Sequence, residues 1–332
     1  MARVTISDVA KRAGVAMGTV SNMLNHPEKV RPETREIISR AIKELGFVPN
    51  RNASVLAGGR NPVFGLVLTG LDHAFSLQVS QGVYDAAREA GFDLMITSAD
   101  NDDILANHYV DYFRGARMSG IIVEPRPGAD WRPDWPDDIP TVVLDYRSDS
   151  CDLCQVCADN VQAGVVAAEH AARIGRRRVA VISASDDIQS LNDRWRGIRS
   201  VADHAEIINV DDWRNPRSGY EAGVLLAERD DDMRPDFVIA LTDVLAAGCI
   251  DGVLSRGYSV PDDIAVMGCD GNPLAWGGPI PMTTIEPHGY EMGRAAVELL
   301  VDEIRHADEH RHTVRTIPSR LLIRKSTDSG RH

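Results

Sequence analysis

From residue 63 onward, short apolar runs alternate with amphipathic stretches, and this alternation restricts the possible folds more than any other feature of the chain. Amphipathic helices are predicted near 76–90, 102–114, 160–174, 191–203, 216–229 and 243–256. The strand-like runs are FGLVLTG, FDLMITS, GIIVEP and TVVLD, followed by VAVISA, FVIAL and IAVMGC. Continuously apolar strands separated by helices are typical of a parallel sheet covered on both faces. Because the pattern occurs twice, we predict an α/β fold with two doubly wound lobes.

The first 60 residues differ from this body in charge. They contain ten Lys or Arg and five Asp or Glu, a net charge of +5. Since the whole chain carries -13, the remainder carries −18. A small basic domain joined to an acidic body indicates that only the amino-terminal end faces a nucleic acid.

The amino-terminal segment has the features of a helix-turn-helix. Thr5 and Asp8 are spaced as a capping box, and the helix that they begin ends at Gly14. A second short helix is predicted from Val15 to Asn25. Two short helices joined by a tight glycine turn place the second helix in the major groove of DNA. Its outward face is small and uncharged: Met17, Gly18, Thr19, Ser21, Asn22 and Asn25.

A third helix begins at Pro32 and ends at Gly46. Its predicted apolar stripe is Ile37, Ile38, Ala41, Ile42 and Leu45. Three such helices also form purely structural bundles, but an uncharged outward face suits hydrogen bonds to base edges. Basic residues around it are candidates for phosphate contacts: Arg3, Lys11, Arg12, Lys29, Arg31 and Arg35.

The segment TISDVAKRAGVAMGTVSNMLNHPEKVRPETREIISRAIKELGFVPN closely resembles the head of the LacI/GalR transcription regulators. The pieces D-V-A-x-x-A-G-V, T-V-S and E-T-R-x-x-I occur in that family's order and spacing. The resemblance implies that Met17, Gly18 and Asn22 point at base edges of an operator in double-stranded DNA. The DNA contacts that we predict in this head are those of Thr5, Met17, Gly18, Thr19, Ser21, Asn22 and Asn25.

A linker follows the head, and Gly58, Gly59 and Pro62 mark its end. Composition alone is compatible with a plain flexible linker. The resemblance instead implies a hinge helix over about 50–57 that orders on DNA, with Leu56 wedged into the minor groove. We therefore expect a helix-turn-helix domain at 1–49 and a hinge and linker at 50–60.

The body resembles the periplasmic-binding-protein-like core of the same family, through DRWRGI, TDVLAAG, VPDDIAVMGCD and MTTIEP. The resemblance implies three crossings of the chain between two lobes. We expect an amino-terminal effector-binding lobe at 61–159 plus 288–317. The carboxy-terminal lobe is expected at 160–287 plus 318–328.

Candidate effector-binding residues follow from the ends of strands that face the crevice between the lobes. Carboxylates and an arginine suit hydrogen bonding to a sugar or nucleoside, and aromatic rings supply stacking faces. A single Asp at a strand end is more often a helix cap, but Arg194, Asp243 and Asp270 also match positions where the family contacts ligands. Trp276 is a further candidate aromatic. The predicted set is Asp72, Phe75, Ser76, Asp145, Arg194, Trp213, Asp243 and Asp270.

The spacing Cys151-x-x-Cys154-x-x-Cys157 suggests a metal site, but Cys249 and Cys269 are remote in sequence and offer no suitably spaced fourth ligand. On a strand, Cys154 would face away from the other two. We therefore expect partly buried thiols, no metal and no cofactor.

The predicted function is a sequence-specific transcription regulator, a homodimeric repressor controlled by a small effector. The alternatives are a solute-binding protein with no DNA role and an α/β enzyme. A secretory signal and membrane-length apolar runs are missing from the sequence, which indicates a cytoplasmic protein without a membrane partner. No lysine lies between 44 and 324, and no G-x-S-x-G, Walker or H-E-x-x-H motif occurs, which argues against an enzyme.

Overall fold

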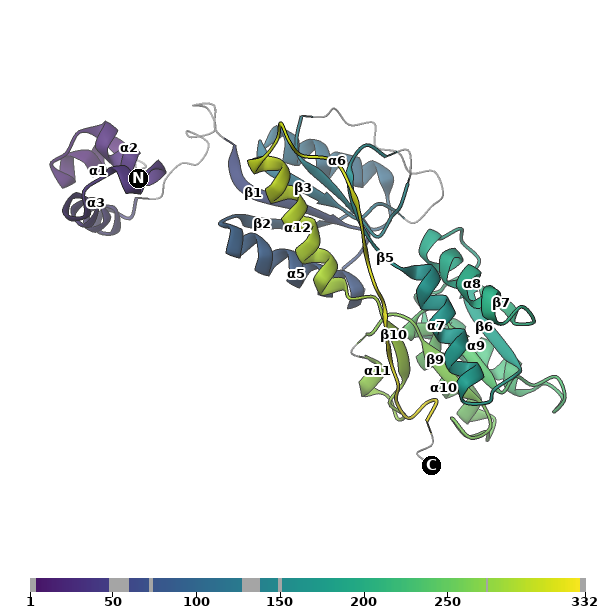
Figure 1. Ribbon diagram of the computed structural model, residues 1–332. Helices are drawn as coiled ribbons and strands as arrows, with labels where there is room; N and C mark the ends of the chain where they lie inside the picture. The colour runs from purple at the N-terminus through teal and green to yellow at the C-terminus, as the bar shows by residue number, and fades with distance from the viewer. Residues whose placement is uncertain are drawn as a thin grey trace. The chain divides into compact units, whose positions relative to one another are not determined.

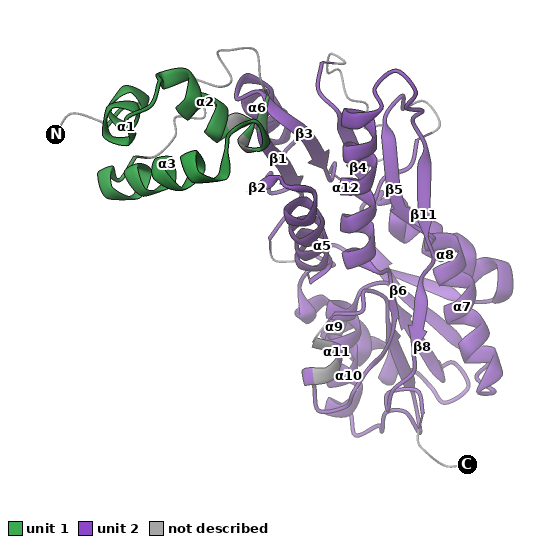
Figure 2. Cartoon of the chain, turned by 60° about the vertical axis from the view of Figure 1, so that its left-hand side comes forward, with its two compact units in different colours: residues 1–61 green, residues 62–332 purple. Residues whose placement is uncertain are grey.

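The structure is a computed structural model and describes residues 4–47, 60–71, 74–126, 138–148, 151–272 and 274–328. The chain divides into two compact units, Met1–Asn61 and Pro62–His332, coloured separately in Figure 2. The predicted hinge helix, Leu56 and Asp72 lie outside the described residues.

The first unit contains three helices, α1 (Ile6–Ala13), α2 (Met17–Asn25) and α3 (Pro32–Leu45), with a short 3-10 turn at Pro27–Lys29. The capping box is confirmed: the Thr5 backbone N–H donates to Asp8 Oδ2 at 2.9 Å, and the Asp8 N–H donates back to Thr5 Oγ1. Gly14 ends α1 with φ 67°, a left-handed conformation that favours glycine. The helix-turn-helix therefore forms where the sequence predicts it.

The core of this unit comes from all three helices. Val9, Val20 and Ile38 have no exposed surface. They pack with three further buried residues, Ala10, Ala41 and Phe47. The predicted stripe of α3 was wrong at one position, because Ile37 is 48% exposed. Its neighbour Ile38 turns inward instead, since adjacent helical residues lie about 100° apart.

In the second unit, the first six-stranded sheet of the described residues has the order β11-β5-β4-β3-β1-β2. The pairings of β1 with β2, β3 with β4, β4 with β5 and β5 with β11 are parallel. The strands are β1 (Asn61–Leu68), β2 (Asp93–Ser98), β3 (Met118–Val123), β4 (Thr141–Leu144), β5 (Cys154–Ala158) and β11 (Val314–Ile317).

Both faces of this sheet are covered, which explains its continuously apolar strands. Successive side chains point to opposite faces: Leu66 and Ile122 join one buried cluster, while Val67 and Ile121 join another. Helices α5 (Ala74–Ala90) and α12 (Gly289–Arg305) cover the first face. Helix α6 (Asp103–Gly115) covers the second.

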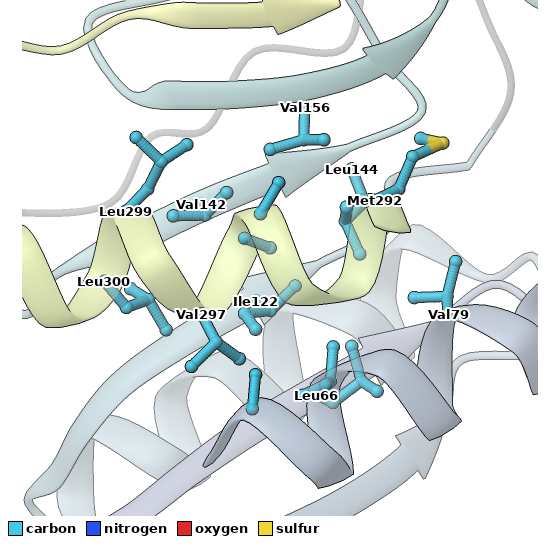
Figure 3. Close-up of a cluster of buried hydrophobic side chains, with 14 of the residues drawn as sticks. Leu66, Val79, Ile122, Val142, Leu144, Val156, Met292, Val297, Leu299 and Leu300 are labelled. Atoms are coloured by element: carbon cyan, nitrogen blue, oxygen red, sulfur yellow. The ribbon is translucent and has the colours of Figure 1, made fainter. Parts of the chain in front are cut away.

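Helix α12, which the sequence analysis did not identify, lies directly on the sheet (Figure 3). Its residues Met292, Val297 and Leu300 pack against strand residues such as Leu144 and Ile122. These side chains have at most 2% of their surface exposed. A segment from the last sixth of the chain thus completes the core of the first lobe.

The second six-stranded sheet of the described residues has the order β12-β10-β9-β8-β6-β7, and only the pairing of β12 with β10 is antiparallel among the pairings defined there. One face is covered by α7 (Asn160–Arg173) and α8 (Gln189–Val201). The other is covered by α9 (Pro216–Ala227), α10 (Asp243–Ser255) and the short α11 (Leu274–Gly277). The strands are β6 (Val179–Ala184), β7 (Glu206–Val210), β8 (Phe237–Ala240), β9 (Ala265–Gly268), β10 (Thr283–Glu286) and β12 (Arg320–Leu322).

The chain passes between the two sheets more than once (Figure 1). It leaves the first sheet after β5, returns after β10, and leaves again between β11 and β12. The doubly wound, two-lobed fold class is therefore confirmed, while the exact limits of the lobes stay a prediction. No helix among the described residues is long and apolar enough to cross a membrane.

Candidate functional site

The first candidate site is the outward face of α2. Its anchor is Val20, which is fully buried in the head core. Because helical residues three and four apart share a face, the positions between core residues point to solvent. Met17 is 57% exposed, Gly18 and Asn22 are exposed, and Thr19 and Ser21 are half-buried.

The other predicted DNA contacts of the head differ in availability. The Thr5 hydroxyl donates to Asp8 Oδ2 at 2.7 Å, so its proton is used within the capping box. The described part of the structure does not include the side chain of Asn25. Arg12 is paired with Glu44 on α3, whereas Lys11, Lys29 and Arg31 have exposed side chains. These DNA contacts stay predictions.

The second candidate site lies in the core unit, where the ends of the two sheets meet. Arg194 on α8 is its most heavily bonded residue and is only 7% exposed. Its Nε donates to Asn160 Oδ1 at 2.9 Å, and its Nη1 donates to the carbonyl oxygens of Leu241 and Cys269 at 2.7 and 2.8 Å. Arg194 therefore ties α7 and α8 to the carboxyl ends of β8 and β9.

Two carboxylates lie beside this arginine. Asp270 Oδ1 lies 3.5 Å from Arg194 Nη1, and Asp270 Oδ2 accepts the Asp243 backbone N–H at 3.0 Å. Asp243 is fully buried and accepts the Thr284 hydroxyl and the Asn272 backbone N–H, both at 2.6 Å. Burial, and then the nearby Asp270 carboxylate, raise the pKa of Asp243. The buried Asp243 and Arg194 thus fix the position of Asp270, which is more exposed.

A cavity of about 50 Å³ opens beside Asp270. A buried water needs about 10–15 Å³ on this measure, so the cavity has room for a few waters. Phe75 from the start of α5 and Trp213 before α9 supply aromatic walls from the two lobes. The lining residues are Ala74, Phe75, Trp213, Arg214, Thr242, Val244, Asp270 and Asn272.

A larger cavity of about 610 Å³ lies beside Asp145 and is strongly polar. A pair of hydrogen bonds joins the lobes here: the Arg147 backbone N–H donates to Gln189 Oε1, and Gln189 Nε2 donates to the Arg147 carbonyl, both at 2.8 Å. The lining residues are Asp145, Arg147, Cys157, Ala158, Asp159, Asn160, Val161, Gln189, Asp193, Arg196 and Thr316.

A further carboxylate, Glu124, follows β3 and was not predicted. Its Oε2 accepts the Thr69 backbone N–H at 3.2 Å and the Ser76 hydroxyl at 3.4 Å. Burial, and then repulsion from Asp145, raise the pKa of Glu124 from 4.5 to about 7. Burial also raises the pKa of Asp145 to about 6, although Arg194 acts in the opposite direction. Two carboxyl groups that resist ionisation therefore influence each other, and one of them, Asp145, lines the larger cavity.

The predicted effector-binding residues separate into three groups. Phe75, Trp213 and Asp270 line the smaller cavity, whereas Asp145 lines the larger one. Arg194 and Asp243 lie behind the cavity walls and hold Asp270, and the buried Ser76 holds Glu124. Glu124 and Asn160 were missed, although Glu124 follows β3 just as Asp145 follows β4. The side chain of Trp276 is outside the described part.

A basic three-helix head with an uncharged recognition face, attached to a two-lobed α/β core, defines the class of DNA-binding transcription regulators. Residues 5–50 match the family described as bacterial regulatory proteins, lacI family, and residues 168–327 match the periplasmic binding protein-like domain. The chain therefore combines a DNA-binding domain of the lacI family with a periplasmic binding protein-like domain. A solute-binding protein without a DNA role has no support from these matches.

Relatives share nearly the whole length of the chain. It is 29% identical to the HTH-type transcriptional repressor PurR of Mannheimia succiniciproducens, covering 97% of this chain and 98% of the relative. It is 28% identical to the ribose operon repressor of Halalkalibacterium halodurans, covering 98% of both.

Solved structures agree on the fold. A lac repressor dimer bound to operator and the anti-inducer ONPF superposes with a TM-score of 0.83 at 22% identity, covering 98% of this chain and 99% of that one. A complex of the transcriptional regulator CelR with cellobiose gives a TM-score of 0.67 at 26% identity, covering 98% and 100%. This chain therefore shares with these structures the folds of its head and of its two-lobed core.

Proposed function

We propose that this protein is a repressor whose affinity for operator DNA is controlled by a small polyhydroxylated effector, a sugar or a nucleoside, bound between the two lobes. The observation that carries the proposal is the recognition face of α2, held outward by the buried Val20. Relatives named as the transcriptional repressor PurR and a ribose operon repressor support it, as does a similar regulator in complex with cellobiose.

The proposed DNA-binding form is a homodimer, which reads a pseudo-palindromic operator with one head in each half-site. The charges support contact through the heads alone, since the first 60 residues carry +5 and the rest of the chain −18. The cleft is assigned to ligand binding rather than to catalysis. An effector that favours one lobe arrangement would then change operator affinity through linkage between the two sites.

Replacing Asn22 with alanine should weaken operator binding about 10- to 100-fold, because a side chain bonded to a base edge contributes roughly 1–3 kcal/mol. Asn22 is exposed on α2, so the head should remain folded. Binding is measured by fluorescence anisotropy at fixed salt on a site selected from a palindromic library. Ser39→Ala, an exposed change on α3, is the control and should bind as the unmodified protein does. Equal affinities for both variants would contradict the assignment of α2.

In the cleft, the smaller cavity is the proposed effector site, because it combines aromatic walls with the positioned Asp270 carboxylate. A stacked sugar or base ring would lie between Phe75 and Trp213, and Asp270 would accept hydrogen bonds from its hydroxyl groups. The present volume of about 50 Å³ requires the lobes to separate for entry. Such a motion would break the two hydrogen bonds between Gln189 and Arg147. These bonds would then be made in a closed arrangement of the lobes and broken in an open one.

Replacing Phe75 with leucine should lower effector affinity about tenfold, since it removes a stacking face but keeps an apolar side chain. The effector is first identified by thermal shift with a panel of sugars and nucleosides. Its affinity is then measured by calorimetry, and operator binding is measured separately. Phe92→Leu makes the same change outside the cleft, where Phe92 stacks on Phe64 at 4.2 Å. If Phe92→Leu reduced effector affinity as much as Phe75→Leu, the cavity would not be the site.

A further inference from the structure

Cys154 lies beside two histidines that are distant in sequence. Its Sγ is 3.2 Å from His310 Nε2 and 3.7 Å from His312 Nδ1. Cys154 is the first residue of β5 and is fully buried, while the histidines belong to the segment between α12 and β11. Since β11 pairs with β5, this segment is brought against the start of β5.

The C-x-x-C-x-x-C spacing does not bring the three thiols together. Cys157 faces the opposite side of β5, where its Sγ is 3.9 Å from the Arg315 carbonyl oxygen. Cys151 packs at the edge of the cluster on that other face of the sheet. The partners of Cys154 are therefore residues 156 and 158 positions downstream, which no local motif connects to it.

The three ligand atoms have the separation that a tetrahedral metal ion requires. Zn–S and Zn–N bonds of about 2.3 and 2.05 Å at a tetrahedral angle place sulfur and nitrogen about 3.6 Å apart. The two observed separations, 3.2 and 3.7 Å, lie on either side of this value. All three atoms lie within 4.8 Å of one another.

Two carboxylates of α12 flank the His310 ring. Glu303 Oε2 lies 3.8 Å from His310 Nε2, and its side chain is 15% exposed. On the other side of the ring, His310 Nδ1 lies 2.8 Å from Asp302 Oδ2. A neutral ring that donates from Nδ1 to Asp302 leaves the Nε2 lone pair free to bind a metal, as in carboxylate–histidine–zinc triads. The His310 side chain is only 4% exposed, so this orientation is well fixed.

We propose that Cys154, His310 and His312 form a binding site for Zn²⁺, and that the nearby Glu303 carboxylate turns toward the ion as the fourth ligand. Thiolate, imidazole and carboxylate are the donors that this ion takes in proteins, usually four of them. A metal here would join the last turn of α12 and the 306–313 connection to β5. It would thereby fix β11, the edge strand from which the chain crosses to the second lobe.

The test uses the full-length chain, freed of metal by a chelator and kept reduced. Co²⁺ serves as the spectroscopic probe, and Zn²⁺ is then used to displace it. We expect one equivalent of Co²⁺ with a thiolate-to-cobalt charge-transfer band and the intense visible bands of a tetrahedral site. At Zn²⁺ a hundredfold above its Kd, linkage predicts an increase in Tm of about 5 °C.

Three variants separate ligands from neighbours. Cys154→Ser should abolish the charge-transfer band, and His312→Ala, a change at an exposed residue, should weaken Zn²⁺ binding at least tenfold. His306→Ala is the matched control, because His306 Nδ1 also lies close to Asp302, at 3.0 Å, but outside the cluster. If His306→Ala weakened binding as much as His312→Ala, or if Cys154→Ser retained the band, the proposal would be overturned. If Cys154→Ser fails to fold, the proposal is tested by the Zn²⁺ affinities of His312→Ala and His306→Ala alone.

Discussion

Replacing Gly164 with alanine should destabilise the core unit by about 3 kcal/mol, although the change adds one methyl group to a helix that would otherwise gain from it. Gly164 lies in α7, where it faces α8. A Cβ atom at this position would lie 2.0 Å from the Arg194 carbonyl oxygen and 2.9 Å from the Ile198 backbone nitrogen. Both obstacles are backbone atoms of a helix, so no side-chain rotation can relieve the overlap, and the two helices must move apart.

The consequence reaches the cleft, because α7 and α8 carry Asn160 and Arg194. Their 2.9 Å hydrogen bond depends on the close approach of the two helices. We therefore expect Gly164→Ala to lower both the urea midpoint of unfolding and the affinity for effector, while the head keeps its operator contacts. Gly115→Ala is the control, because a Cβ at Gly115, the last residue of α6, meets no atom within 4 Å. Equal midpoints for the two variants would show that the helices adjust without cost.

The sequence predicted most readily the strands in which burial on both faces requires a continuous run of apolar residues. β3 and β4 are covered on both faces and read as continuous apolar runs. The edge strands β7 and β11 gave no such signal, although the edge strand β2 did. β7 alternates between exposed and half-buried residues, and β11 does the same. An edge strand buries less of its surface, so its residues need not be apolar, and its position becomes clear only from the pairing with its neighbour.

In the candidate site, residue type was easier to predict than residue role. Arg194 was expected to contact the effector, but it is buried and bonded to two carbonyl oxygens and Asn160. An arginine has five N–H donors in a fixed geometry, and nothing in the sequence says which of them protein atoms already occupy. The cluster around Cys154 was beyond prediction for a related reason. Its histidines are more than 150 residues away, and only the pairing of β11 with β5 brings them close.

Glu124→Gln should make the protein more stable at alkaline pH and leave it nearly unchanged in mild acid. The pKa of Glu124 is raised from 4.5 to about 7, so the folded state holds this proton more tightly than the unfolded state does. Stability from this group is complete below pH 4.5 and is lost as the pH rises to about 7. At 1.36 kcal/mol per pH unit, this lowers the free energy of unfolding by at most about 3 kcal/mol. Glutamine has no proton to lose in this pH range, so the variant keeps its stability.

The measurement is the free energy of unfolding in urea at pH 5 and at pH 8. The free energy of unfolding of Glu124→Gln, relative to that of the unmodified protein, should rise by roughly 2–3 kcal/mol from pH 5 to pH 8. Glutamine can still accept the Thr69 N–H, so the local hydrogen bond is retained. Glu169→Gln, at an exposed position of α7, controls for the titration of the other carboxyl groups and should show no such growth. If the difference in the free energy of unfolding stayed constant with pH, Glu124 would ionise freely and water would reach its carboxylate.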